Sequence, residues 1–134
     1  MEFIVGVVLA AAVGLFASVV GFDKERSFYP VVLIVVAACY LLFAAMANST
    51  NALVAEALPA LFFVAAAVLG FRRTLWIVVV GLAFHGVFDF VHPAVIVNPG
   101  VPAWWRGFCS AYDVTAAVYL AALLLADRKS TRLN

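Results

Sequence analysis

Charged residues are scarce in this chain of 134 residues. They make up 11% of the sequence, whereas 68% of the residues are hydrophobic, and the mean hydropathy is +1.17. Soluble domains are about 25% charged and about half apolar, and a small domain in water buries only about two-thirds of its chain surface. A soluble fold could not hide this much apolar surface. The composition therefore predicts an integral membrane protein.

Other absences narrow the range of functions. The net charge is only +1, so the chain lacks the basic face with which proteins bind nucleic acid. It contains two cysteines, which we interpret as small apolar side chains because free cysteine packs readily in apolar interiors. No phosphate-binding loop, dinucleotide-binding fingerprint, nucleophile elbow or zinc-finger spacing occurs. The sequence therefore contains no motif that is typical of a nucleotide-binding protein, an α/β-hydrolase or a zinc finger.

Long apolar runs fill most of the chain. They cover residues 3–20, 29–47, 52–70, 75–92 and 102–126. Each run approaches the roughly 20 residues that a helix needs to cross about 30 Å of hydrocarbon, and none alternates with the period of a barrel strand. We predict an all-α, polytopic bundle of five transmembrane helices that forms one domain, residues 1–127, in the lipid bilayer. Residues 128–134 would form a short tail, and we assign it no function because its ending resembles translated adapter sequence.

The basic residues predict the orientation of this bundle. With five spans, only Arg106 of the eight basic residues falls on one side of the membrane. The other seven fall on the opposite side: Lys24, Arg26, Arg72, Arg73, Arg128, Lys129 and Arg132. Cytoplasmic loops carry the excess of lysine and arginine. We therefore expect a multi-pass protein of the bacterial inner membrane, with the N-terminus outside and the C-terminal tail in the cytoplasm.

Small residues line one face of the first apolar run. Gly6, Ala10, Gly14 and Ser18 follow one another at intervals of four residues. Such a stripe allows two helix backbones to approach closely in a membrane. We predict that this face packs against another helix, in a homo-oligomer or in a larger membrane complex.

Ionisable residues inside the apolar runs are the candidate site. On a helix with about 100° per residue, His85, Asp89 and His92 fall on one narrow face. A charge in hydrocarbon costs about 3 kcal/mol on the insertion scale, so such residues usually serve a function. Asp113 in the fifth run and Glu56 in the third come to similar depths, in the outer half of the bilayer. Because antiparallel neighbouring helices pack side by side, we expect Asp113 within hydrogen-bonding distance of His85 or Asp89.

Three interpretations of this polar site remain open. Imidazole and carboxylate groups form a suitable ligand set for zinc, iron or manganese, which predicts a divalent metal site formed by His85, Asp89, His92 and Asp113 with Glu56 nearby. An enzyme would need such a metal to activate water or oxygen. Alternatively, the protein is a proton-coupled transporter of a small solute. The third interpretation is a non-catalytic accessory subunit in which a His–Asp pair only joins two helices.

The connection between the fourth and fifth runs is apolar for a loop. Pro99 and Gly100 suit the central positions of a type II turn, and Asn98 precedes them. We expect this segment to fold against the membrane or over the polar site, either as a lid or as a rigid turn.

A set of polar residues, prolines and a cysteine has a distinctive spacing in the C-terminal half. It comprises His85, Asp89, His92, Asn98, Pro99, Pro102, Cys109, Tyr112 and Asp113. This pattern, His-x3-Asp-x2-His followed by Asn-Pro and then by cysteine and aspartate, resembles a DUF6010-like group of small uncharacterised bacterial integral membrane proteins. The resemblance covers residues 85–113 and leaves out the first three apolar runs. It implies a small polytopic membrane protein whose histidines and aspartates act as one unit.

Overall fold

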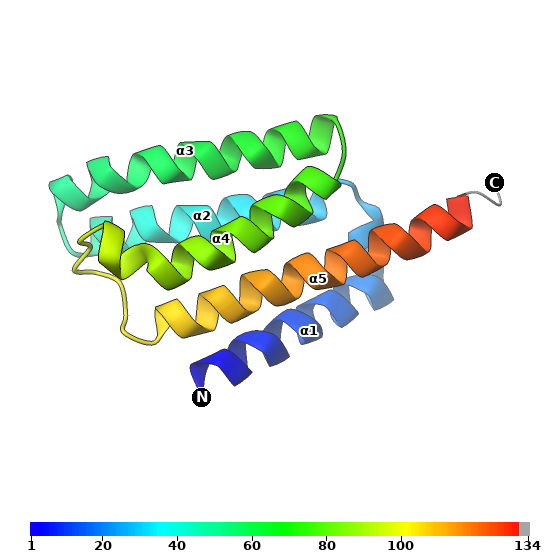
Figure 1. Cartoon of the computed structure of the whole chain (residues 1–134), viewed down its shortest axis with the longest axis horizontal. Helices are drawn as coiled ribbons and strands as arrows, with labels where there is room; N and C mark the ends of the chain where they lie inside the picture. Colours follow the sequence, from blue (N-terminus) through cyan, green and yellow to red (C-terminus); the bar gives the residue numbers. More distant parts are fainter. Residues whose placement is uncertain (132–134) are drawn as a thin grey trace.

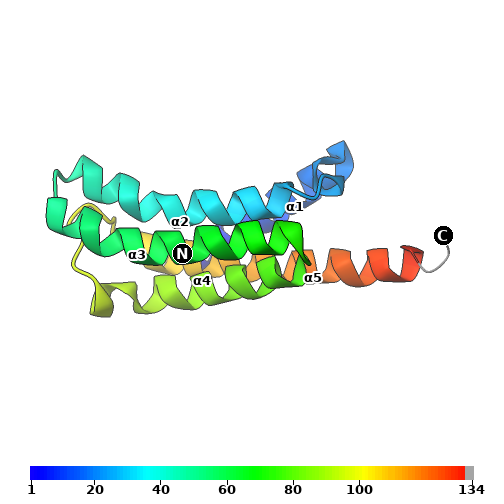
Figure 2. The ribbon, with the colours of Figure 1, turned by 90° about the horizontal axis from the view of Figure 1, so that it is seen from above.

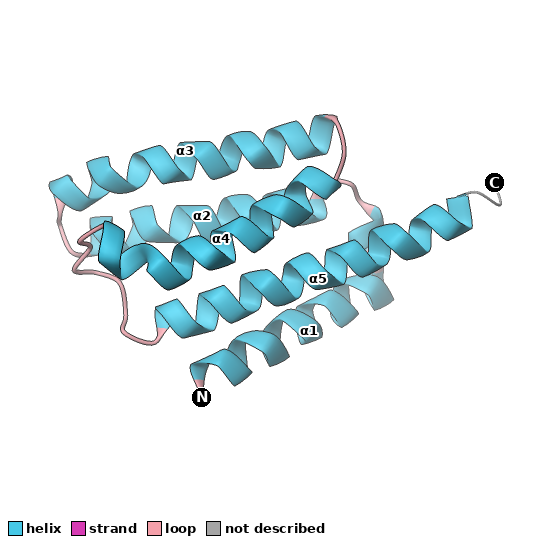
Figure 3. Cartoon of the chain, viewed as in Figure 1, coloured by secondary structure: helices cyan, strands magenta, loops and turns pink. Residues whose placement is uncertain are grey.

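A computed structural model describes residues 1–131 and shows an all-helical chain (Figure 1). The helices are α1 (Glu2–Val20), the 3-10 helix η1 (Phe22–Lys24), α2 (Phe28–Met46), α3 (Thr50–Arg72), α4 (Trp76–Val95) and α5 (Trp105–Thr131). Residues 1–131 contain no strand (Figure 3). The helices α1 to α5 are all long and apolar enough to cross a membrane. The predicted all-α bundle of five long apolar helices is therefore confirmed, and the fold suits a multi-pass membrane protein.

Two helix boundaries differ from the prediction. We expected the fourth helix to stop at Pro93, but α4 continues to Val95 and the amide of Ile96 still donates to the carbonyl of His92 at 2.9 Å. Proline removes a single hydrogen bond, and this close to the helix end the loss does not break the last turn. The fifth helix begins at Trp105 instead of near Pro102, because the carbonyl of Pro102 accepts a turn hydrogen bond of 3.1 Å from the Trp105 amide.

At its other end, α5 extends to Thr131. The first four residues of the predicted tail, 128–131, are therefore helical, in line with an Arg-Lys-Ser-Thr stretch that contains no glycine or proline. The rest of the predicted tail lies outside the described residues.

Two helix pairs are joined through α4 (Figures 1 and 2). Helix α1 packs along α5, α2 packs along α3, and α4 packs against α5, α3 and α2. Helix α4 is thus central, and its polar face can meet side chains from three other helices. The fourth and fifth helices are packed neighbours, as predicted.

Side chains are distributed as in a protein that lipid surrounds. Leu33, Phe63 and Leu82 from three different helices are at most 2% exposed and fill the space around α4. Outward-facing positions also carry apolar side chains, such as Leu58 at 76% and Val19 at 85% exposure. Because the outer surface is apolar too, the polar residues are concentrated in the interior, where they need partners.

The small-residue face of α1 is covered within the chain. Gly6, Ala10 and Gly14 are buried, Gly14 lies against the ring of Tyr119 on α5, and the Ser18 hydroxyl lies 2.8 Å from the Tyr119 hydroxyl. The stripe therefore brings α1 close to α5. A contact with a second copy or with a partner protein stays a prediction.

Candidate functional site

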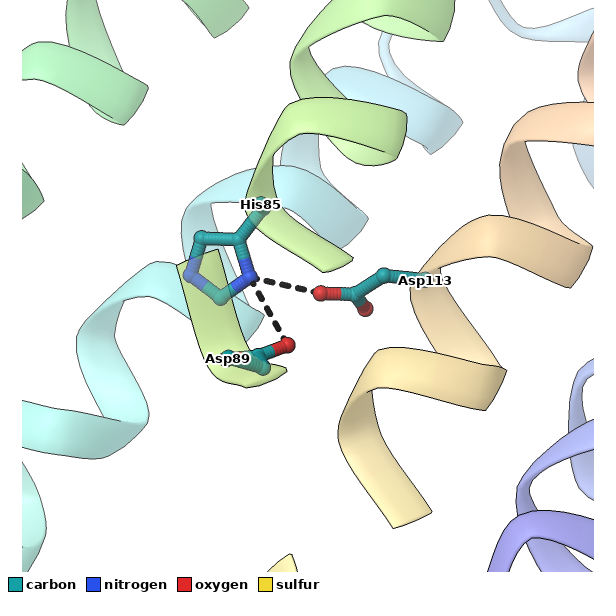
Figure 4. A group of neighbouring side chains, drawn as sticks. All are labelled: His85, Asp89 and Asp113. Atoms are coloured by element: carbon teal, nitrogen blue, oxygen red, sulfur yellow. Dashed lines mark hydrogen bonds and ion pairs between the residues drawn. The ribbon is translucent and has the colours of Figure 1, made fainter. Parts of the chain in front are cut away.

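Three fully buried ionisable side chains meet between α4 and α5 (Figure 4). His85 and Asp89 lie one turn apart on α4, and Asp113 comes from α5. The His85 Nδ1 atom is 2.6 Å from Asp113 Oδ2 and 3.3 Å from Asp89 Oδ2. The prediction that Asp113 lies within hydrogen-bonding distance of His85 is confirmed. We call these three residues the three-residue cluster.

The close approach of α5 to α4 depends on a glycine. A Cβ atom at Gly86 would lie 2.8 Å from Val114 Cγ2 and 3.1 Å from the carbonyl oxygen of Ser110. Gly86 follows His85 directly, so the two helices lie close together beside the histidine. This local approach lets the short side chain of Asp113 reach the imidazole ring.

Tyr40 on α2 is a member of the site that the sequence did not reveal. Its hydroxyl donates a hydrogen bond of 2.6 Å to Asp89 Oδ1, and the residue is 3% exposed. In the sequence it stands within an apolar run and resembles core filler. The available signal was that a buried tyrosine hydroxyl usually finds a partner. We expected the site between the third, fourth and fifth helices, whereas the three-residue cluster is completed by α2.

His92 lies apart from the three-residue cluster. Its Nε2 atom is 2.6 Å from Glu56 Oε2 on α3, and both side chains are at most 2% exposed. His92 follows His85 by seven residues, which is about 10 Å along a helix axis, and its ring nitrogen is directed to Glu56. His85, Asp89 and Asp113 come together, while His92 forms the Glu56–His92 pair, and the four-residue metal set stays a prediction.

Tyr40 connects the two groups. Its ring stacks on the imidazole of His92, with centroids 4.0 Å apart and planes 16° apart, while its hydroxyl binds Asp89. One side chain of α2 therefore contacts both the three-residue cluster and the Glu56–His92 pair.

The loop after α4 folds back over the Glu56–His92 pair, as expected. The Asn98 side-chain amide donates to Glu56 Oε2 at 2.8 Å and to the Tyr40 carbonyl at 3.1 Å. The Val101 amide closes a turn onto the Asn98 carbonyl at 3.3 Å. The predicted type II geometry is wrong, because Gly100 does not adopt the positive φ that this turn requires. Glycine is needed there for a different reason: its backbone lies directly against the Phe43 carbonyl, and a Cβ atom would collide with it.

Three buried polar atoms of the site have no hydrogen-bond partner: His85 Nε2, Asp89 Oδ2 and Glu56 Oε1. His85 Nδ1 also lies 3.3 Å from Asp89 Oδ2, but this contact is not a hydrogen bond, so Asp89 Oδ2 has no hydrogen-bond partner. An unsatisfied buried group costs about 1–3 kcal/mol, and more when it is charged. The three-residue cluster thus has a free carboxylate oxygen beside an imidazole nitrogen.

Comparisons with models of known protein families, with curated proteins and with solved structures find no match for this chain. The resemblance to DUF6010-like proteins stays a prediction.

Proposed function

We propose that this protein binds one divalent metal ion inside the membrane through His85, Asp89 and Asp113. The observation that carries the proposal is the convergence of three ligand atoms, one from each residue, all within 4.8 Å of one another in a fully buried site. An imidazole nitrogen and two carboxylate oxygens suit zinc, iron or manganese. Three protein ligands also leave a coordination position for water or substrate, as in catalytic zinc sites.

The charge of the cluster supports a divalent ion. Two ionised carboxylates carry two negative charges, and a neutral imidazole does not change that sum. A buried charge is stable only when it is paired or bound to a metal, and no lysine or arginine among residues 1–127 forms an ion pair with Asp89 or Asp113. A divalent cation would bring the site to neutrality without further residues.

The neighbouring side chains would orient the ligands. The Tyr40 hydroxyl donates its hydrogen bond to Asp89 Oδ1, which leaves Asp89 Oδ2 free to bind the ion. Cys109 Sγ lies 3.8 Å from Asp113 Oδ2, one helical turn before it. Such outer contacts hold ligands in place and strongly affect metal affinity. When bound, the metal would polarise or activate a molecule in its open coordination position.

A second candidate function is proton-coupled transport. The site contains two acid–histidine pairs, His85–Asp113 and His92–Glu56, each at 2.6 Å, and Tyr40 contacts both groups. Two protons would then neutralise the three-residue cluster in place of the metal. Histidine and carboxylate chains of this kind serve as proton relays in membrane pumps and transporters.

We also propose that the N-terminus is outside and the three-residue cluster lies in the outer half of the bacterial inner membrane. The distribution of basic residues supports this orientation. Arg26, after α1, donates to the Phe71 carbonyl at the end of α3 at 2.6 Å, so Arg26 and Arg72 belong to the same end of the bundle.

Metal analysis of the purified full chain tests the main proposal. Protein prepared in detergent without chelator should contain one divalent metal ion per chain by mass spectrometry, and His85→Ala should contain none. The proposal is overturned if the wild-type protein contains no stoichiometric metal and takes up none from zinc, iron, manganese or copper. Solute uptake that depends on pH without any bound metal would favour the proton-coupled alternative.

A further inference from the structure

A pocket of about 390 Å³ lies at the end of the bundle where α4 ends and α5 begins. The connection between these two helices (Figure 1) supplies most of the residues that line the pocket, and His92 of α4 and Arg106 of α5 add polar side chains. Both helices are long and apolar enough to cross a membrane, so their shared end lies near the edge of the bilayer. Phospholipid headgroups occupy this level of a membrane.

The guanidinium group of Arg106 is exposed, held in position and unpaired. Its Nε atom donates a hydrogen bond of 2.8 Å to the Phe90 carbonyl, and its central carbon lies 4.2 Å from the centroid of the Phe90 ring. These two contacts fix the group beside the C-terminal part of α4. No acid among residues 1–127 forms an ion pair with Arg106, so its terminal nitrogens are available to a ligand.

Negative charge is absent from the pocket wall. None of the aspartates and glutamates of residues 1–127 lines the pocket. Glu56 lies behind the wall: it is 1% exposed, and its Oε2 atom is within hydrogen-bonding distance of His92 Nε2 and of the Asn98 side-chain amide. The pocket therefore presents the positive charge of Arg106 without an acid that opposes it.

We infer that this pocket binds the headgroup phosphate of an anionic phospholipid through Arg106. The planar guanidinium group binds two phosphate oxygens at once, and basic pockets between membrane helices bind lipid headgroups. Ile96 and Val101 in the wall would contact the glycerol and the first acyl carbons, a contact that a free phosphate ion lacks. The volume lies within the range of about 300–1,000 Å³ that small-molecule pockets have. The inference goes beyond the metal site and does not depend on it.

Lipid retention tests the inference. The full chain in detergent is mixed with equal amounts of phosphatidylglycerol and phosphatidylcholine that carry the same acyl chains, and the bound lipids are counted by native mass spectrometry. We expect one phosphatidylglycerol molecule per chain to be retained in preference to phosphatidylcholine, because the choline group would bring a second positive charge close to Arg106. Equal retention of the two lipids overturns the inference.

Removal of one arginine separates the pocket from general charge. Arg106→Gln should weaken the binding of phosphatidylglycerol about tenfold, the effect of losing one hydrogen bond between charged groups. Arg73→Gln is the matched control, because Arg73 is an exposed arginine that follows α3, near the opposite end of α4. This control should bind phosphatidylglycerol as the wild type does. Equal losses in the two variants would mean that net positive charge alone attracts the lipid, and would overturn the inference.

Ala103→Trp tests the pocket while it keeps Arg106. Ala103 lines the pocket and is exposed, so an indole ring there should fill the space and abolish the preference for phosphatidylglycerol. Ala94→Trp, the same change at an exposed residue of α4 outside the lining, should retain the preference. An unchanged preference in Ala103→Trp would contradict the inference. Inorganic phosphate that displaces phosphatidylglycerol at equal concentration would show that the pocket takes a free anion, and would overturn the assignment to a lipid.

Discussion

Tyr40 donates a hydrogen bond of 2.6 Å from its hydroxyl to Oδ1 of Asp89. The bond joins α2 to α4 within the membrane and occupies one of the two carboxylate oxygens. The other, Oδ2, has no hydrogen-bond partner and faces His85. The tyrosine therefore determines which oxygen of Asp89 remains available for a ligand.

Removal of this hydroxyl should weaken metal binding without abolishing it. Tyr40→Phe keeps the ring that stacks on His92 and loses only the bond that orients Asp89. We expect metal affinity to fall about 10–100-fold, the usual effect of losing such an orienting contact. Competition with a chelator of known affinity measures the change.

Tyr29→Phe is the matched control for this variant. Tyr29 is a buried tyrosine on the same helix, outside the polar site, so this change should leave metal affinity unchanged. An equal loss in both variants would mean that α2 tyrosines act only through general stability. No loss in Tyr40→Phe would remove Tyr40 from the metal site.

Asp113→Asn should eliminate stoichiometric metal while the α4–α5 contact persists. The amide keeps the shape of the carboxylate and can still hydrogen-bond His85, but it removes one of the two negative charges that a divalent ion needs. Since a ligand that binds only the folded state stabilises by about 2.7 kcal/mol at 100 times its dissociation constant, added metal should raise the melting temperature of the wild type and not of this variant.

Asp127→Asn serves as the control for Asp113→Asn. Asp127 is the exposed acid near the other end of α5, and this change should preserve both the metal content and the metal-dependent rise in melting temperature. Metal retained at the wild-type level in Asp113→Asn would contradict the role of Asp113 as a ligand.

The sequence predicted the cluster because two simple regularities were sufficient. Helical periodicity places His85 and Asp89 on one face, and the antiparallel fifth helix brings Asp113 to the same depth. Both inferences need only the spacing of residues and the direction of the helices. The five spans followed equally directly from the length of the apolar runs.

The partner of His92 and the role of Tyr40 could not be predicted in the same way. Each depends on which helices are neighbours beyond the fourth and fifth, and apolar composition does not encode that packing. A glutamate on α3 and a tyrosine on α2 are identified as partners only when the helices are placed. The reason for the glycine at position 100 could not be predicted either. The Pro-Gly pair suggested a type II turn, whereas the structure requires glycine there because its backbone lies against Phe43.

His92→Ala should reduce stability more than it reduces metal content. His92 is bonded to Glu56 and is not part of the three-residue cluster, so the variant should still bind one metal ion, with a modest loss of affinity transmitted through Tyr40. Its melting temperature should fall because Glu56 loses a strong partner while it remains buried. Glu56→Gln in the His92→Ala background should restore part of the stability by removing the unpaired charge. Complete loss of metal in His92→Ala would instead place His92 among the ligands.

The proposed orientation predicts opposite labelling of two exposed loop positions. In a background with Cys39→Ala and Cys109→Ala, Ala103→Cys should react with a membrane-impermeant maleimide in intact cells, because the loop before α5 would face outside. Arg73→Cys, at the end of α3, should react only after the cells are opened. Ala103 and Arg73 are both exposed, so burial does not bias the comparison, and Ala103 does not share the hydrogen bonds that hold Asn98. Labelling of position 73 and protection of position 103 in intact cells would reverse the orientation and move the three-residue cluster to the cytoplasmic half of the membrane.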